Sequence, residues 1–200
     1  MLLPDGKPAS GATILYAVLQ EQFGLNGTSV SSYGGKEGFL TTKADGKFSF
    51  PRLSKGLKLF VAHPSGYVEE SVERGGDNLK LRLKPWATLT GTLVYSNGTA
   101  AANVPLDLAI DYNWQRGDPI MHIQGKIVTD AQGNFLFTNV PPRHIQVNRM
   151  QTSGFGGGYS SIQQTWLDVS PGVTNELGKV TYDTPPPAPM IDQIKQKLGL

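Results

Sequence analysis

Alternation of apolar and polar side chains is the dominant pattern of this 200-residue chain. Leucine occupies every second position over 79–84, with lysine and arginine between, and residues 104–111 repeat the alternation. A strand with one buried face requires this period of two. Residues 57–63 are apolar on both faces, as in a central strand. Because helical periodicity is almost absent before the last residues, the pattern predicts an all-β fold.

The chain contains the same pattern twice. "KADGKFSF" (43–50) and "TDAQGNFLF" (129–137) both place an Asp-Gly-type turn before Phe-x-Phe, and Gly46 aligns with Gly133 at an offset of 87 residues (133 − 46). Upstream, "DGKPASGATILY" corresponds to "SNGTAAANVPLDL". A period of about 90 residues suits a duplicated domain rather than a solenoid repeat. Because both rings of a Phe-x-Phe pair lie on one strand face, each pair is expected to anchor one core.

Gly, Pro, Asn and Asp punctuate the strands at the spacing of an antiparallel sandwich. Pro85 separates the last strand of one copy from the first of the next. We therefore expect a first sandwich over 1–85 and a second over 86–183. Residues 184–200 are expected to form a Pro-rich linker and a short amphipathic helix, whose apolar positions are Met190, Ile191, Ile194 and Leu198.

The stretches "DGKPASGATI", "TTKADGKFSFPRL" and "VTDAQGNFLFTNVPP" resemble the carboxypeptidase regulatory-like domain. The resemblance covers both copies and implies two tandem prealbumin-like (transthyretin-like, Ig-like) antiparallel β-sandwiches. It also implies an extracytoplasmic bacterial setting: cell surface, periplasm or secreted. In that family a Gly-containing strand opens the sandwich, as "ATLTGTLVY" does in the second copy. The first copy starts at the turn after it, so its first strand is expected to lie outside this sequence or to come from another chain.

Charge and composition narrow the classes of function. The 18 basic and 16 acidic residues form no run of like charge, so we expect no nucleic-acid partner. Cysteine is absent, which excludes disulfides and thiolate sites. No run approaches the length of a membrane span, and the first residues do not resemble a signal peptide.

Motifs for catalysis and metal binding are missing from the sequence. The three histidines, His63, His122 and His144, form no zinc-binding spacing, and no nucleophile elbow occurs. The glycine-rich stretch 154–161 is interpreted as a flexible connection between strands. Asp45 and Asp130 are assigned to turns rather than to calcium. No Lys–Asn pair for an isopeptide bond can be assigned, and we predict no catalytic residue, metal or cofactor.

Two long segments, 22–38 and 112–119, are predicted to be loops that connect equivalent strands in the two copies. They combine aromatic, amide and arginine side chains, a mixture typical of sites for sugars or peptides. The alternative is that the rings fold back over the end of a sandwich. The candidate ligand-binding residues are Trp114, Tyr112, Asn113, Arg116, Tyr33 and Phe23.

The sequence thus predicts a non-catalytic accessory, spacer or ligand-binding module of a larger extracytoplasmic protein. Two alternatives stay open: a carbohydrate-binding domain, and a regulatory domain attached to a peptidase outside this chain. The expected partners are a polysaccharide or a protein surface, and other domains of the parent chain. The resemblance specifies the fold better than the function, because this domain is joined to many different proteins.

Overall fold

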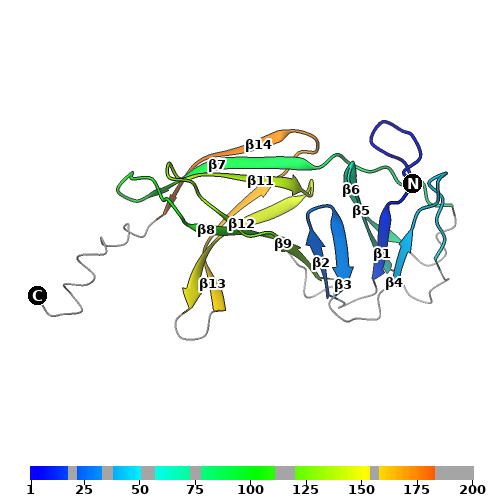
Figure 1. The fold of residues 1–200 in the computed structure, drawn as a ribbon, viewed down its shortest axis with the longest axis horizontal. Coiled ribbons are helices and arrows are strands. Elements are labelled where there is room, and N and C mark those ends of the chain that lie inside the picture. The colour runs from blue at the N-terminus through cyan, green and yellow to red at the C-terminus, as the bar shows by residue number, and fades with distance from the viewer. Residues whose placement is uncertain are drawn as a thin grey trace, which may run out of the picture.

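A computed structural model describes residues 1–17, 22–32, 38–50, 57–72, 78–110, 120–153 and 158–182 (Figure 1). Every regular element in these residues is a strand, which confirms the all-β prediction. The helix predicted near the C-terminus lies outside the described residues. We call residues 1–85 the first half and residues 86–182 the second half.

The first half contains a four-stranded antiparallel sheet with the order β4-β1-β5-β6. Its central strand β5 (Leu57–His63) is buried on both faces, as its continuous apolar sequence predicts. The other strands are β1 (Thr13–Ala17), β4 (Gly38–Thr41) and β6 (Gly66–Val72).

One face of this sheet packs on an end cluster that includes Met1, Ala9, Leu81 and Leu83. Burial alternates along 79–84 as predicted, but the segment forms isolated β-bridges instead of a regular strand. The Leu2 amide donates to the Leu81 carbonyl (2.8 Å), and the Leu83 amide donates to the Leu2 carbonyl (2.9 Å). These isolated bridges give residues 79–84 the alternating side-chain directions of a strand, although the segment has no continuous ladder of hydrogen bonds.

The second half is a β-sandwich of two facing sheets. One has the order β10-β8-β12-β13 and the other β11-β7-β14. Their facing sides bury one shared core, to which β7, β8, β11 and β12 contribute Leu89, Leu93, Leu106, Leu108, Phe135, Phe137, Ile145 and Val147. The strands are β7 (Ala87–Tyr95), β8 (Pro105–Ile110), β10 (Ile127–Val128), β11 (Asn134–Val140), β12 (His144–Ser153), β13 (Gly158–Asp168) and β14 (Thr174–Tyr182).

A third sheet, β3-β2-β9, joins the two halves (Figure 1). β2 (Gln22–Asn26) pairs in parallel with β9 (Ile120–Gln124) and antiparallel with β3 (Ser29–Ser32). The prediction of a loop over 22–38 is therefore wrong for its first part. Residues 23–25 (Phe-Gly-Leu), expected in a loop, lie in β2, and all three are buried.

Backbone hydrogen bonds repeat between the halves at an offset of 92 residues (98 − 6). In each half, a tight turn is closed by a glycine amide, and an alanine amide donates to the residue eight positions earlier. The pairs are Gly6 to Leu3 and Gly98 to Tyr95, then Ala9 to Met1 and Ala101 to Leu93, all between 2.8 and 3.2 Å. The same local path is thus built twice.

Two buried threonines extend this correspondence. The Thr42 hydroxyl donates to the Ala9 carbonyl and accepts from the Ala12 amide. The Thr129 hydroxyl donates to the Ala101 carbonyl (2.6 Å) and accepts from the Val104 amide (2.9 Å). Each hydroxyl satisfies one buried acceptor and one buried donor.

The two Phe-x-Phe pairs differ in burial. Phe135 and Phe137 are both 4% exposed and anchor the core of the second half, as predicted. Phe48 and Phe50 are only partly buried against the end cluster. The second pair lies on β11, whose inner face packs against the opposite sheet, whereas residues 47–50 form no strand in the described part of the first half. The expectation that both pairs anchor a core is therefore corrected for Phe48 and Phe50.

Candidate functional site

Most of the predicted binding residues lie outside the described residues: Trp114, Tyr112, Asn113, Arg116 and Tyr33. Phe23 is described, and it is 1% exposed in β2. Its ring centroid lies 4.1 Å from that of Phe60 at an interplanar angle of 47°. The prediction of an exposed, ligand-stacking ring is wrong for Phe23, because the strand turns this side chain into the core between the halves.

Asp45 and Asp130 act in turns, as the sequence indicates. Asp45 Oδ1 accepts from the Lys47 amide (3.0 Å), and Asp130 Oδ1 accepts from the amides of Gln132 (2.9 Å) and Asn134 (2.7 Å). These backbone hydrogen bonds lower the pKa of Asp130, since they stabilise the charged carboxylate. Among the described residues, no three acidic or histidine side chains gather in a way that could hold a metal ion.

Two further observations concern segments named in the sequence. The interpretation of the glycine-rich stretch as a connection is wrong for residues 158–161, which belong to β13, and residues 154–157 lie outside the described residues. In the part of the chain with described structure, no helix is long and apolar enough to cross a membrane.

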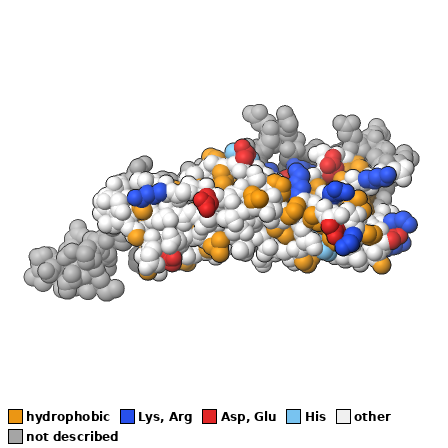
Figure 2. All heavy atoms as spheres, turned by 90° about the horizontal axis from the view of Figure 1, so that it is seen from above, with side chains coloured by type: hydrophobic (Ala, Val, Ile, Leu, Met, Phe, Trp, Pro, Cys, Tyr) orange, Lys and Arg blue, Asp and Glu red, His pale blue; other side chains and the backbone are white. Residues whose placement is uncertain are grey.

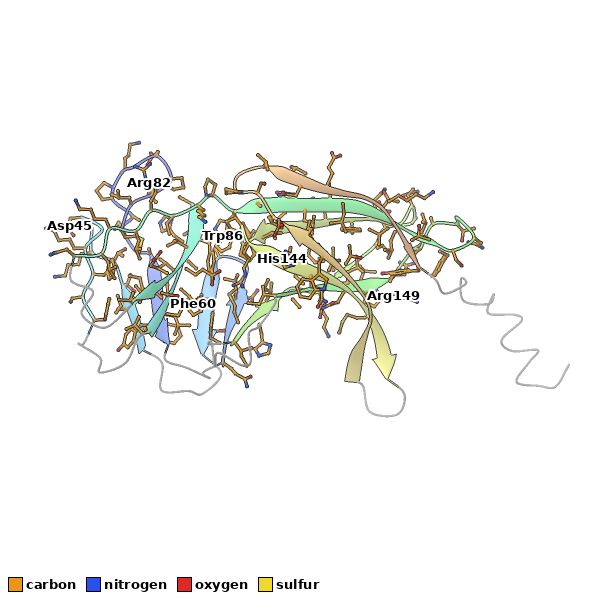
Figure 3. The ribbon with its side chains drawn as sticks, turned by 180° about the vertical axis from the view of Figure 1, so that it is seen from behind. Asp45, Phe60, Arg82, Trp86, His144 and Arg149 are labelled. Atoms are coloured by element: carbon orange, nitrogen blue, oxygen red, sulfur yellow. The ribbon has the colours of Figure 1, made fainter. Side chains whose placement is uncertain are left out.

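A polar and aromatic junction connects the halves around Tyr67. This ring is 2% exposed, lies 5.4 Å from the Trp86 ring, and its hydroxyl donates to Met121 Sδ (3.5 Å). Trp86 Nε1 donates to the His63 carbonyl (2.8 Å). Burial raises the pKa of Tyr67 well above its usual value, because the phenolate would lose its hydration. Figure 3 places Trp86 in the middle of the molecule, where the halves meet.

An ion cluster lies beside this junction. Arg143, next to the start of β12, contacts both carboxylate oxygens of Glu69 in β6, at 2.8 and 3.0 Å. Lys58 Nζ lies 3.4 Å from the same carboxylate. The three side chains are only 20–23% exposed, so solvent screens them less than a surface pair. Both contacts come from one guanidinium nitrogen of Arg143, Nη1, and the ion pair connects the first half with the second.

Charged side chains elsewhere are mixed in sign. Figure 2 shows lysines and arginines interspersed with acidic residues, mainly over the first half, with no extended patch of one sign on this face. The described part of this face therefore offers no focused field for a highly charged partner.

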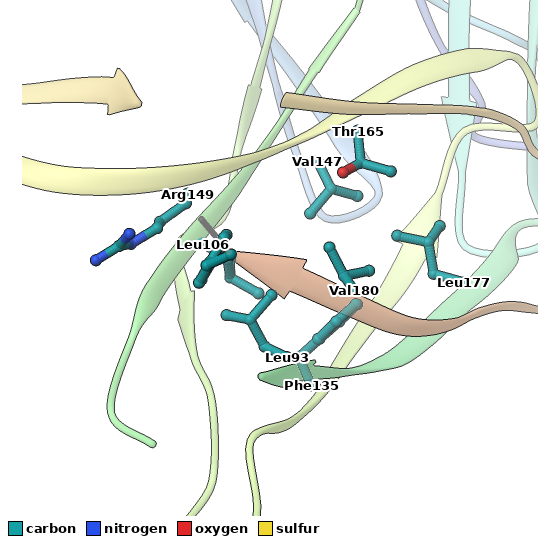
Figure 4. A pocket seen from close by; sticks show the side chains of 9 residues that line it. Leu93, Leu106, Phe135, Val147, Arg149, Thr165, Leu177 and Val180 are labelled. Atoms are coloured by element: carbon teal, nitrogen blue, oxygen red, sulfur yellow. The ribbon is translucent and has the colours of Figure 1, made fainter. Parts of the chain in front are cut away.

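The second half contains a small pocket between its two sheets (Figure 4). Leu93, Leu106, Phe135 and Val180 are among its apolar walls, and Arg149 lines one side. The Arg149 guanidinium lies 4.5 Å from the Tyr182 ring centroid. A volume of about 10 Å³ holds about one water, so this pocket is too small for a ligand.

A pair of stacked rings occupies the outer face of the β10-β8-β12-β13 sheet. The rings of His144 and Trp166 lie 5.1 Å apart and 3° from parallel, and His144 Nδ1 lies 2.7 Å from Asp168 Oδ1. We call His144 and Trp166 the ring platform. The sequence analysis did not identify it. A usable signal was present, since Trp166 alternates with Leu167 and Val169 and must therefore lie on the face opposite the core.

Fold and site together define an all-β protein of the β-sandwich class with no recognisable catalytic constellation in its described residues. The sequence matches no family model. It also matches no curated protein.

Among solved structures, the minor pilin GBS52 of Streptococcus agalactiae is similar, with a TM-score of 0.44 and 15% identity over 92% of this chain and 88% of that one. The streptococcal ancillary pilin has a TM-score of 0.42 and 12% identity, over 93% and 61% of the two chains. The major pilin subunit BcpA of Bacillus cereus has a TM-score of 0.36 and 13% identity, over 88% and 60%. Similarity at this level says nothing about function.

Proposed function

We propose that residues 1–85 and 86–183 are two copies of one unit that resembles the carboxypeptidase regulatory-like domain. The hydrogen bonds repeated at an offset of 92 residues support this proposal, together with the matching Thr42 and Thr129 bridges. Residues 184–200 are then a Pro-rich linker and a short amphipathic helix. In this interpretation the opening strand of the second unit is β7. Residues Met1 to Leu3 of the first unit correspond to the end of that strand, at the offset of 92 residues.

The function we propose is that of a non-catalytic, stiff spacer or accessory module. One observation carries it: the halves share a parallel strand pair, β2 with β9, and a continuous apolar core. Flexible tandem domains have small, polar interfaces, whereas a shared sheet and core resist bending. The Arg143–Glu69 ion pair adds a charge-assisted contact between the halves.

The setting and partners of the module follow from the sequence resemblance. We propose an extracytoplasmic bacterial location, with other domains of a parent chain and a polysaccharide or protein surface as partners. The site around Trp114 in segment 112–119 stays a prediction. A peptidase-linked regulatory role would require a catalytic domain in the parent chain.

The test of stiffness exploits the absence of cysteine, which makes introduced thiols specific. Spin labels at Lys80→Cys and Thr138→Cys report the distance between the halves by pulsed electron–electron double resonance. Labels at Thr138→Cys and Lys179→Cys report a distance within the second half. Because the halves share a core, we expect both pairs to give distributions of similar width. A distribution between the halves that is several times broader would refute the spacer function.

A further inference from the structure

The outer face of the second half's larger sheet presents a distinct set of side chains. Along β12, Ile145 and Val147 point into the core, so His144 and Gln146 lie on the opposite face, where His144 is exposed and Gln146 is only 6% exposed. On β13, Leu167 packs against the core and Trp166 therefore lies on the same outer face. The register pairs His144 with Asp168 and Gln146 with Trp166. His144 and Trp166 are thus diagonal neighbours, a spacing that aromatic side chains can bridge.

The ring platform is held in place before any ligand arrives. Its rings are parallel within 3°, and Asp168 fixes the His144 ring through Nδ1 at 2.7 Å. The rings lie at the end of the β12–β13 ladder, because β12 begins at His144 and β13 ends at Asp168, and the paired backbone of both strands leads up to them. Trp166 is nevertheless 42% exposed, and the His144 side chain is 48% exposed. A fixed, exposed aromatic surface loses little conformational entropy when it binds.

We propose that the ring platform binds a neutral saccharide chain made of pyranoses with equatorial substituents, such as β-1,4-linked glucose or N-acetylglucosamine. Such a sugar has a flat C–H face that packs on the electron-rich face of an indole ring. Its rim of hydroxyl groups needs hydrogen-bond acceptors. The Asp168 carboxylate beside the rings is 89% exposed, and among described residues only its Oδ1 is engaged. The proposal goes beyond the spacer function and does not depend on it.

A saccharide fits this surface better than a protein partner does. Protein interfaces need a contiguous apolar patch of several hundred Å². The other exposed large apolar side chains among the described residues lie elsewhere: Leu136 on the facing sheet, Val128 on the far edge strand β10, Val173 before β14, and Phe39 in the first half. Among the side chains that the structure describes, Trp166 is therefore an apolar surface beside the polar residues His144 and Asp168, which matches the amphipathic character of a sugar.

The test is to titrate the 200-residue protein with cellohexaose and chitohexaose by isothermal calorimetry. Trp166→Ala should weaken binding at least about 30-fold, as expected for an aromatic hot spot. His144→Ala should weaken it by a smaller factor, because His144 stacks on one face of the indole and the sugar would pack on the other. Leu136→Ala is the control: it truncates an exposed apolar side chain on the other sheet (57% exposed, against 42% for Trp166) and should leave the affinity unchanged.

A second measurement uses the unmodified protein, in case a variant unfolds. The indole N–H resonance of Trp166, assigned from Trp166→Phe, should shift during the titration, and the indole resonance of Trp86 at the junction should not. The proposal is overturned if neither hexasaccharide binds at millimolar concentration. It is also overturned if Trp166→Ala binds with unchanged affinity, or if the Trp166 resonance stays in place while heat is released. None of these outcomes bears on the distance distribution that tests the spacer function.

Discussion

Replacement of Phe60 by alanine tests whether the two halves are one folding unit. Phe60 is 1% exposed in β5, and its ring lies 4.1 Å from the Phe23 ring. It belongs to the apolar cluster that continues into the second half. Truncation of a fully buried phenylalanine costs about 3–5 kcal/mol, from lost burial and the cavity left behind. Loss of the contact with Phe23 accounts for about 0.5–1.5 kcal/mol of this.

The assay is urea unfolding followed by tryptophan fluorescence, combined with amide hydrogen exchange. Because the cluster is shared, Phe60→Ala should lower the exchange protection of Ile145 and Val147 in β12 as well as that of Leu59 and Val61 in β5. Phe48→Ala is the control, since this ring is only partly buried and packs on the end cluster. Its expected cost is roughly 1–2 kcal/mol, in proportion to the smaller area that it buries. It should leave protection in β12 nearly unchanged.

Two results would refute this reasoning. A loss below about 1 kcal/mol for Phe60→Ala would mean that the site collapses to fill the cavity or that the ring is not buried in solution. Unchanged protection in β12 despite a large loss in β5 would mean that the halves unfold independently. The junction would then be an interface between two domains, not part of a common core.

The repeated backbone path yields two further predictions. Thr42→Val and Thr129→Val should each lower the free energy of unfolding, measured in urea, by about 1–3 kcal/mol, because each leaves a buried amide and a buried carbonyl without a partner. A loss in only one of the two variants would contradict the structural equivalence of the two threonines. Gly46→Ala and Gly133→Ala should each lower the free energy of unfolding by at least about 2 kcal/mol more than Gly98→Ala does in the same assay. All three glycines have positive φ, but only at Gly46 and Gly133 would an added Cβ clash with a backbone oxygen. Equal losses at all three positions would show that backbone strain alone sets the effect.

Local patterns were enough to predict much of the fold. Alternation along 104–111 predicted β8, and the all-apolar sequence of 57–63 predicted a strand buried on both faces. The Phe-x-Phe pattern identified the core of the second half. These features depend on residues close together in the chain, for which the period of side chains directly reports the environment.

Other features depend on pairings across about 100 residues, which no local pattern encodes. β2 was predicted to be a loop, but it pairs in parallel with β9, and its Phe23 is buried against Phe60 of β5. The partial exposure of Phe48 likewise depends on which distant residues pack against its ring, here those of the end cluster. The ring platform could have been predicted in part, because alternation assigns Trp166 to the outer face. Its stacking on His144 depends on the register of β12 with β13.

The parallel pairing of β7 with β14 determines how the second half responds to tension. The chain enters this half at Ala87 and leaves it at Tyr182, and the register places Thr88 beside Thr174 and Tyr95 beside Tyr182. The points of entry and exit therefore lie at opposite ends of the strand pair. A force that stretches the chain slides one strand along the other and loads all their hydrogen bonds at once, instead of opening them one by one as a zipper. A segment built in this way withstands pulling along its length much better than its free energy of unfolding alone would suggest, because resistance to force is governed by the rate of unfolding.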